Sequence, residues 1–185
     1  MSQQSQWRQV GLDLCMSINI SPKNLTDLDL PEKMMSCALE SGGEIDRIMF
    51  ELTETALLSD VAGSIDVLSR LRMKNFKLSI DDFGTGYSSL QQLVRVPFTE
   101  LKIDQSFVRK IVNDKECKTI SEISILLAHK LDMNVVAEGI EHQVEWNILK
   151  EMGCDIGQGY WIGRPMPADE IKAWIKNWHS SEISD

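Results

Sequence analysis

Polar side chains recur along this sequence, each at the end of a short apolar run. They comprise carboxylates, a lysine and two side-chain amides: Asn19, Glu51, Asp81, Asp82, Lys102, Glu138 and Gln158. Carboxylate and amide oxygens are the ligands that magnesium, manganese and calcium prefer, whereas zinc usually recruits histidine or cysteine. Because so many carboxylates repel one another unless cations lie among them, the set predicts a divalent-metal site.

The apolar runs that carry these residues alternate with segments of helical spacing. The predicted strands are 14–20, 48–52, 76–80, 100–103, 134–137 and 153–159. The predicted helices are 32–41, 61–74, 106–112, 119–131, 144–152 and 168–178. Strands that read apolar nearly throughout and are separated by helices predict a parallel sheet buried on both faces. In a (β/α) barrel the carboxyl ends of such strands meet on one face, where active sites lie. Polar residues at the ends of successive strands would then share one site, and we therefore predict an α/β fold with a barrel arrangement.

The bulk composition narrows the class of partner. A chain of 185 residues that is 43% hydrophobic fits one globular domain, and its net charge of -9 argues against a nucleic acid polymer or an anionic membrane surface as partner. The cysteines are scattered without a C-x-x-C pair, which suits a reducing compartment. No apolar run approaches the ~20 residues of a membrane segment, and the N-terminus lacks an apolar signal core, so a cytoplasmic location is predicted.

Each of these features also has a purely structural explanation. Asp81 and Asp82 are followed, after Phe83, by Gly-Thr-Gly, a sequence that is typical of loops. Glu54 and Glu138 suit the first turn of a helix, and Lys102 could extend its stem along an edge strand. Because all of them fall at the same place in successive strand-helix units, a shared site is the favoured interpretation.

Six motifs, in this order and spacing, resemble the EAL-domain family: SINIS, FELTET, SIDDFGTGYSSL, ELKIDQSFV, VVAEGIEH and GCDIGQGYWIGRPMP. The resemblance runs from about residue 14 to residue 167, which is nearly the whole chain. It implies a TIM-like barrel and a bacterial phosphodiesterase that hydrolyses cyclic di-GMP to the linear dinucleotide pGpG. Cyclic di-GMP is therefore the implied small-molecule partner.

The resemblance also implies roles for single residues. The implied ligands for one or two Mg²⁺ or Mn²⁺ ions are Asn19, Glu51, Asp81, Asp82 and Glu138. The implied catalytic residues, which orient or activate the attacking water or steady the site, are Lys102, Asp82, Gln158 and Glu54. The implied substrate-binding residues are Asn19, Gln158 and Arg164. The loop that links the site to a dimer interface is implied to comprise Gly84, Thr85, Gly86, Tyr87 and Ser88.

The pattern departs from the family upstream of Asn19. The family's Glu-Ala-Leu strand, whose glutamate is a metal ligand, has no counterpart in residues 1–13, which we predict to form a residual helix. With about six of eight strands, the chain is predicted to be an N-terminally truncated, incomplete barrel. We expect a single EAL-type domain over residues 1–185 with a disordered tail over 179–185. Two exposed sheet edges then predict a homodimer or a strand-completing partner.

Alternative functions remain open at this point. One is a cyclic di-GMP phosphodiesterase that is weak or inactive as this chain alone, because one ligand glutamate is missing. Another is a non-catalytic module derived from an EAL domain that binds cyclic di-GMP or another protein. An aldolase-like barrel with Lys102 as Schiff-base nucleophile is disfavoured, because carboxylates crowd that lysine.

Overall fold

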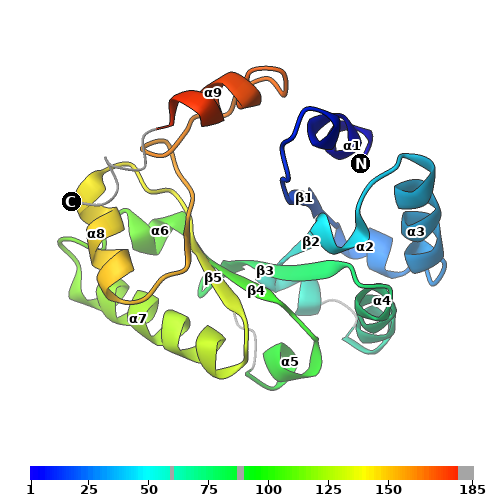
Figure 1. The fold of residues 1–185 in the computed structure, drawn as a ribbon. Coiled ribbons are helices and arrows are strands. Elements are labelled where there is room, and N and C mark those ends of the chain that lie inside the picture. Colours follow the sequence, from blue (N-terminus) through cyan, green and yellow to red (C-terminus); the bar gives the residue numbers. More distant parts are fainter. Residues whose placement is uncertain (59–60, 87–89, 179–185) are drawn as a thin grey trace.

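A curved parallel sheet forms the centre of the molecule (Figure 1). The computed structural model describes residues 1–58, 61–86 and 90–178. The strands are β1 (Met16–Asn19), β2 (Ile48–Thr53), β3 (Lys77–Phe83), β4 (Glu100–Ile103), β5 (Asn134–Ala137) and β6 (Ile156–Gly157). They pair in sequence order, and every pairing is parallel. The six-stranded sheet is a half-barrel, which confirms the predicted fold class.

Most helices follow a strand, and the longer ones lie on the convex side of the sheet (Figure 1). The helices are α1 (Ser2–Gln9), α2 (Pro22–Leu25), α3 (Leu30–Glu40), α4 (Val61–Met73), α5 (Leu90–Arg95), α6 (Gln105–Val108), α7 (Lys115–Lys130), α8 (Gln143–Glu151) and α9 (Ile171–Asn177), with 3₁₀ turns η1 (Ile45–Arg47) and η2 (Glu54–Leu58). Helices α2 and α5 were not predicted, because four and six residues are too few for a helical period to register. No helix in the described ranges is long and apolar enough to cross a membrane.

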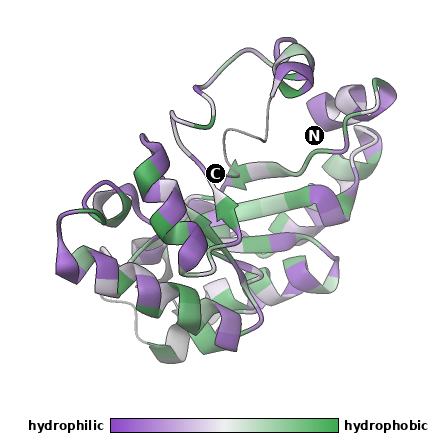
Figure 2. Cartoon of the chain, turned by 60° about the vertical axis from the view of Figure 1, so that its left-hand side comes forward, coloured by the Kyte–Doolittle hydropathy of each residue, from purple (hydrophilic) through white to green (hydrophobic). Residues whose placement is uncertain are grey.

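The apolar core lies between the sheet and the helices. Figure 2 shows hydrophobic residues along the central strands, with hydrophilic and hydrophobic residues alternating along the surrounding helices. Phe50, Ile80 and Leu101 are fully buried on the central strands. Strands β2 and β4 are buried almost throughout, as predicted, but β1 alternates half-buried and exposed residues. This difference follows from position, because β1 is an edge of the sheet and has one neighbouring strand in the described chain.

Helix α1 is fixed to distant parts of the chain. Trp7 Nε1 donates a hydrogen bond of 3.0 Å to the carbonyl of Ala168, 161 residues away. Gln4 is buried, and its Nε2 donates to the carbonyls of Glu44 and Arg47 at 3.4 and 3.3 Å. Its Oε1 accepts from the Glu44 amide at 3.0 Å. The segment before β1 therefore packs against both η1 and the segment that precedes α9.

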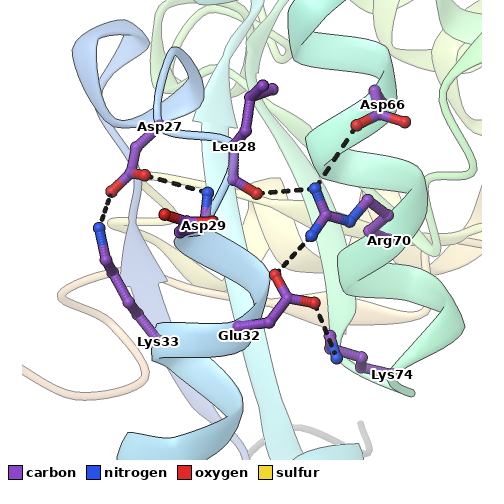
Figure 3. A network of polar contacts seen from close by, with 8 residues as sticks. All are labelled: Asp27, Leu28, Asp29, Glu32, Lys33, Asp66, Arg70 and Lys74. Atoms are coloured by element: carbon purple, nitrogen blue, oxygen red, sulfur yellow. Dashed lines mark hydrogen bonds and ion pairs between the residues drawn. The ribbon is translucent and has the colours of Figure 1, made fainter.

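An ion-pair network joins α4 to the chain around the start of α3 (Figure 3). Arg70 donates to the Leu28 carbonyl at 2.7 Å and to Glu32 at 2.5 Å. Lys74 lies 3.2 Å from the same glutamate, and Asp66 lies 3.6 Å from Arg70. Solvent screens these groups, so each pair stabilises the fold little on its own. The network links α4 to the start of α3 and to the chain between α2 and α3, and it shares no residue with the polar ends of the central strands.

The cysteines differ sharply in exposure, which predicts their reactivity. Cys15 and Cys37 are exposed, whereas Cys117 and Cys154 are buried. Burial raises the pKa of both buried thiols, that of Cys154 to about 11. Because the thiolate is the reactive form, we expect two of the four cysteines to react with a chromogenic disulfide at pH 8 in the folded protein. A thiol titration with and without guanidinium checks this, and four rapidly reacting thiols without denaturant would contradict it.

Candidate metal centre

Strand register brings the polar strand ends onto one edge of the sheet. Asn19 is aligned with Glu51 across β1 and β2, and Thr53 is aligned with Asp81 across β2 and β3. Lys102 lies near the end of β4, and Glu138 directly follows β5. Because all these strands are parallel, their carboxyl ends carry the candidate residues on the same side.

Lys102 lies at the centre of the cluster. Its Nζ is 2.5 Å from Glu138 Oε1, 3.3 Å from Glu51 Oε2 and 3.3 Å from Asp81 Oδ1. The residue is only 5% exposed. Burial lowers the pKa of an ammonium group, but the hydrogen bond to Glu138 and the three negative charges outweigh it and raise the pKa of Lys102. The lysine is therefore a fixed positive charge among the carboxylates.

The carboxylates are arranged as a cation would require. Asp81, Asp82 and Glu138 each offer one oxygen, and these oxygens lie within 4.8 Å of one another. Burial raises the pKa of Asp82, and the charge of Asp81 raises it further. Burial also raises the pKa of Glu138, against the effect of Lys102. Oxygens of Asp81 and Glu138 already contact one cation, the ammonium of Lys102, and an all-oxygen donor set fits Mg²⁺ or Mn²⁺.

A bulge in β3 carries the two adjacent aspartates. The register with β4 shifts between Ile80 and Phe83, and Asp82 has a φ of 56°, in the left-handed region. The Asp82 amide donates to Asp81 Oδ1 at 3.0 Å. The prediction that this strand ends at residue 80 was wrong, since the strand continues through both aspartates to Phe83. A bulge turns the two side chains in different directions from one short stretch of backbone.

The buried Glu54 fixes the loop that follows the bulge. Its Oε2 accepts the amides of Gly84 and Gly86 at 2.9 and 3.0 Å, and the residue is 3% exposed. A Cβ at residue 86 would lie 3.0 Å from the Glu54 carboxyl carbon, so glycine permits this close approach. The loop backbone next to Asp82 is therefore held by a charged acceptor from η2.

Other residues of this loop are only partly described. Thr85 donates through Oγ1 to the carbonyl of Asp82 at 2.8 Å, which closes the turn after the bulge. Tyr87 and Ser88, which the resemblance places in the same loop, lie outside the described residues. The described part of the loop, residues 84–86, thus contacts both Asp82 and Glu54.

The remaining predicted residues differ in how they lie relative to the cluster. Asn19 is exposed at the end of β1, where its register places it beside Glu51. Gln158 follows β6 and lines a cavity together with Glu138. Arg164 lies over the ring of Tyr160, 5.1 Å from its centroid, rather than over the carboxylates. The structure thus brings Glu51, Asp81, Asp82, Lys102 and Glu138 together, with Asn19 beside Glu51 in the strand register and Gln158 at a cavity shared with Glu138.

Two buried acidic residues near the cluster were not predicted. Asp104 caps α6 by accepting the Ser106 amide at 3.0 Å, and its charge contributes to the raised pKa of Asp82. Glu100 is buried and accepts a hydrogen bond of 2.9 Å from Ser79 Oγ. The two-residue spacing of Glu100 and Lys102 on one strand was a usable signal, because it places both side chains on the same face of the sheet.

Glu100 makes stability depend on pH. Its burial raises its pKa, and the hydrogen bond from Ser79 opposes this only in part. A carboxyl group whose pKa is higher in the folded chain destabilises the fold above that pKa, and the cost vanishes as pH falls through its unfolded pKa, about 4.3. We therefore expect Glu100→Gln to raise the Tm at pH 8, with a gain that shrinks toward pH 4. Thermal unfolding in EDTA across this range checks the trend, and a lower Tm at pH 8 would contradict it.

Comparison with known proteins decides the family. The model of the EAL domain matches residues 1–165. The chain belongs to the EAL domain family. The cyclic di-GMP phosphodiesterase RocR of Pseudomonas aeruginosa is 39% identical over 160 residues, covering 86% of this chain and 41% of RocR. The cyclic di-GMP phosphodiesterase PdeR of Escherichia coli K12 is 33% identical over 176 residues, covering 95% of this chain and 27% of PdeR. The chain therefore spans less than half the length of these relatives.

Solved EAL structures share the fold. The PaMucR phosphodiesterase in complex with c-di-GMP superimposes with a TM-score of 0.87 at 33% identity, covering 92% of this chain and 69% of that one. The manganese and cy-diGMP complex of Klebsiella pneumoniae BlrP1 gives a TM-score of 0.81 at 32% identity, covering 89% of this chain and 42% of that one. The six-stranded half-barrel is thus part of a TIM-like barrel of the EAL type, and EAL structures bind divalent ions.

Proposed function

We propose that this EAL domain hydrolyses cyclic di-GMP to pGpG by metal-assisted attack of water. The observation that carries the proposal is the buried lysine held by three carboxylates, with a fourth carboxylate beside them. An anionic phosphodiester cannot approach such a cluster unless cations neutralise it. The names of RocR and PdeR, and the ligand of PaMucR, support cyclic di-GMP as the substrate.

The proposed mechanism needs residues that hold the metal ions, a residue that orients the attacking water and a residue that accepts its proton. The residues that would hold Mg²⁺ or Mn²⁺ are Asn19, Glu51, Asp81, Asp82 and Glu138. The bound ions supply neutralisation of the phosphate charge and a lowered pKa for the attacking water. Lys102 keeps its proton, because its pKa is raised, and donates hydrogen bonds that orient the water. Asp82, whose pKa is raised by burial and by the charge of Asp81, is the group that accepts the proton in this proposal.

Residues around the cluster bind and orient the substrate in this proposal. Gln158 offers an amide at the cavity that it shares with Glu138, where it can donate to a phosphate oxygen. Asn19 and Arg164 contribute a side-chain amide and a positive charge at the edges of the site. Glu54 preserves the geometry by holding residues 84–86 next to Asp82.

A second function is a module that binds cyclic di-GMP or another protein without catalysis. It applies where the glutamate of the Glu-Ala-Leu strand, which residues 1–18 do not contain, is not supplied to the site. Loss of a ligand lowers metal affinity and activity by more than the ~10–100-fold typical of its hydrogen-bonding partners. Without that glutamate, we propose that turnover is weak or absent.

One experiment separates these functions. The purified chain is incubated with cyclic di-GMP and excess Mn²⁺ or Mg²⁺, beside the Asp81→Ala variant, and pGpG is quantified by chromatography. Product that disappears in the variant supports the phosphodiesterase. Binding of cyclic di-GMP by calorimetry without product supports the binding module. The absence of both binding and product contradicts the phosphodiesterase and a module that binds cyclic di-GMP.

Oligomeric state and location complete the proposal. We propose that the chain forms a homodimer or pairs with a strand-completing partner, because β1 and β6 each have one neighbouring strand in the described part. We propose a bacterial cytoplasmic location, in keeping with the free cysteines and the cytosolic second messenger. Light scattering of the purified chain tests the proposed association, and a monodisperse monomer would contradict the homodimer.

A further inference from the structure

The loop between β5 and α8, residues 138–142, begins with the candidate ligand Glu138. A buried carboxylate from α8 fixes its far end. Glu145 is 4% exposed, and its Oε2 accepts the amides of Glu141 and His142 at 2.7 and 3.0 Å. One side chain therefore restrains two successive backbone groups only three and four residues after Glu138.

Helix α6 restrains the same loop from another side. Arg109 Nη2 lies 2.9 Å from Glu141 Oε1. Gly139 has a φ of 72°, and a Cβ at this position would lie 2.4 Å from the Cβ of Gln105. The loop backbone thus packs directly on the helix that begins two residues after Ile103, at the end of the strand carrying Lys102.

The loop also sets the position of Gln158. The Ile140 amide donates to the Gln158 carbonyl at 3.0 Å, and the Trp161 amide donates to the Ile140 carbonyl at 3.1 Å. A Cβ on Gly159 would lie 2.1 Å from the Ile140 carbonyl oxygen. Movement of the loop backbone would therefore displace Glu138 and Gln158 together.

We propose that Glu145 is a positioning residue that holds Glu138 and Gln158 in the geometry of the metal site. It acts on this loop as Glu54 acts on the loop after Asp82, since each buried carboxylate accepts two backbone amides. A role confined to capping α8 would stabilise that helix without affecting metal affinity. The inference deepens the proposed function and rests on it.

The test compares three variants of the full chain. Glu145→Leu removes the acceptor, and Glu145→Gln retains one acceptor oxygen. Asp114→Ala is the matched control, because Asp114 accepts the amides of Glu116 and Cys117 in the first turn of α7, at 2.9 and 3.2 Å. Mn²⁺ affinity is measured by calorimetry without substrate, and amide hydrogen exchange is followed in residues 138–142 and 157–161.

We expect Glu145→Leu to weaken Mn²⁺ binding by about 10- to 100-fold, with faster exchange in both segments. Glu145→Gln should recover most of the affinity, and Asp114→Ala should keep it despite a lower Tm. Equal affinity in Glu145→Leu and Asp114→Ala would overturn the inference, as would unchanged exchange in residues 157–161. Mn²⁺ affinity is measured without substrate, so it is independent of the turnover assay. A chain that binds Mn²⁺ but forms no pGpG in that assay refutes the phosphodiesterase alone, whereas an unmodified chain that binds no Mn²⁺ refutes both proposals.

Discussion

The Lys102→Met variant is expected to reduce whatever cyclic di-GMP turnover the chain has by about 100- to 10,000-fold, and to bind divalent ions more tightly than the unmodified chain. Lys102 contacts three carboxylates but is not itself an oxygen ligand. Its removal takes away the group that orients water, and it also removes the positive charge that competes with a metal for the same oxygens. Turnover and metal affinity should therefore change in different directions, which a general loss of structure cannot produce.

The same variant should be strongly destabilised without metal. Removing one partner of a buried ion pair typically costs about 3–5 kcal/mol, because the remaining charges lose their compensation. Added Mn²⁺ should restore much of this loss, so the rise in Tm on adding the ion should be larger than in the unmodified chain. Differential scanning calorimetry with and without Mn²⁺ measures both quantities.

Lys150→Met is the control for this experiment. Lys150 is an exposed residue on α8, and its replacement should change neither turnover nor the response of the Tm to Mn²⁺. If Lys102→Met retains turnover, Lys102 has no part in the chemistry. If its Tm in EDTA equals that of the unmodified chain, the ion pairs with the three carboxylates do not stabilise the fold.

The cluster was predictable from the sequence because parallel strands align their carboxyl ends. Asp81, Lys102 and Glu138 each lie at the end of a different apolar run. Because the strands are parallel, these residues lie at the same end of the sheet whatever the order of the strands. The strand order itself follows the chain, which is the simplest outcome for repeated strand-helix units. Residue types and their spacing were therefore sufficient to locate the candidate site.

The contacts that fix the cluster were not predictable in the same way. The bulge at Asp82 depends on pairing with β4, and no local sequence pattern predicts that the backbone of Asp82 has a left-handed conformation. Glu145 reads as an ordinary helix-start glutamate, and only the folded loop shows which amides it accepts. Burial of Glu100 depends on the packing of the sheet interior, which a single strand's sequence does not specify. Local pattern placed the reactive groups, whereas tertiary packing determines what holds them.

The bulge leads to a prediction in which stability and activity change in opposite directions. Asp82→Gly is expected to raise the Tm in EDTA and to reduce turnover by at least about 100-fold. A left-handed φ costs a non-glycine residue roughly 1 kcal/mol, and glycine adopts it without that cost. The substitution also removes a carboxyl group whose pKa burial and Asp81 raise, and which therefore destabilises the fold at neutral pH.

Two variants separate the contributions of backbone and charge. Asp132 has the same φ of 56° but lies in the exposed turn before β5, so Asp132→Gly should give the backbone gain with full turnover. Asp82→Asn keeps the side-chain shape and removes the charge, so it should give the electrostatic gain and still lose turnover. If Asp132→Gly is stabilising while Asp82→Gly is destabilising, the bulge is held by contacts of the Asp82 side chain. If Asp82→Gly keeps its turnover, the carboxylate of Asp82 is not needed for the reaction, and the role proposed for Asp82 is wrong.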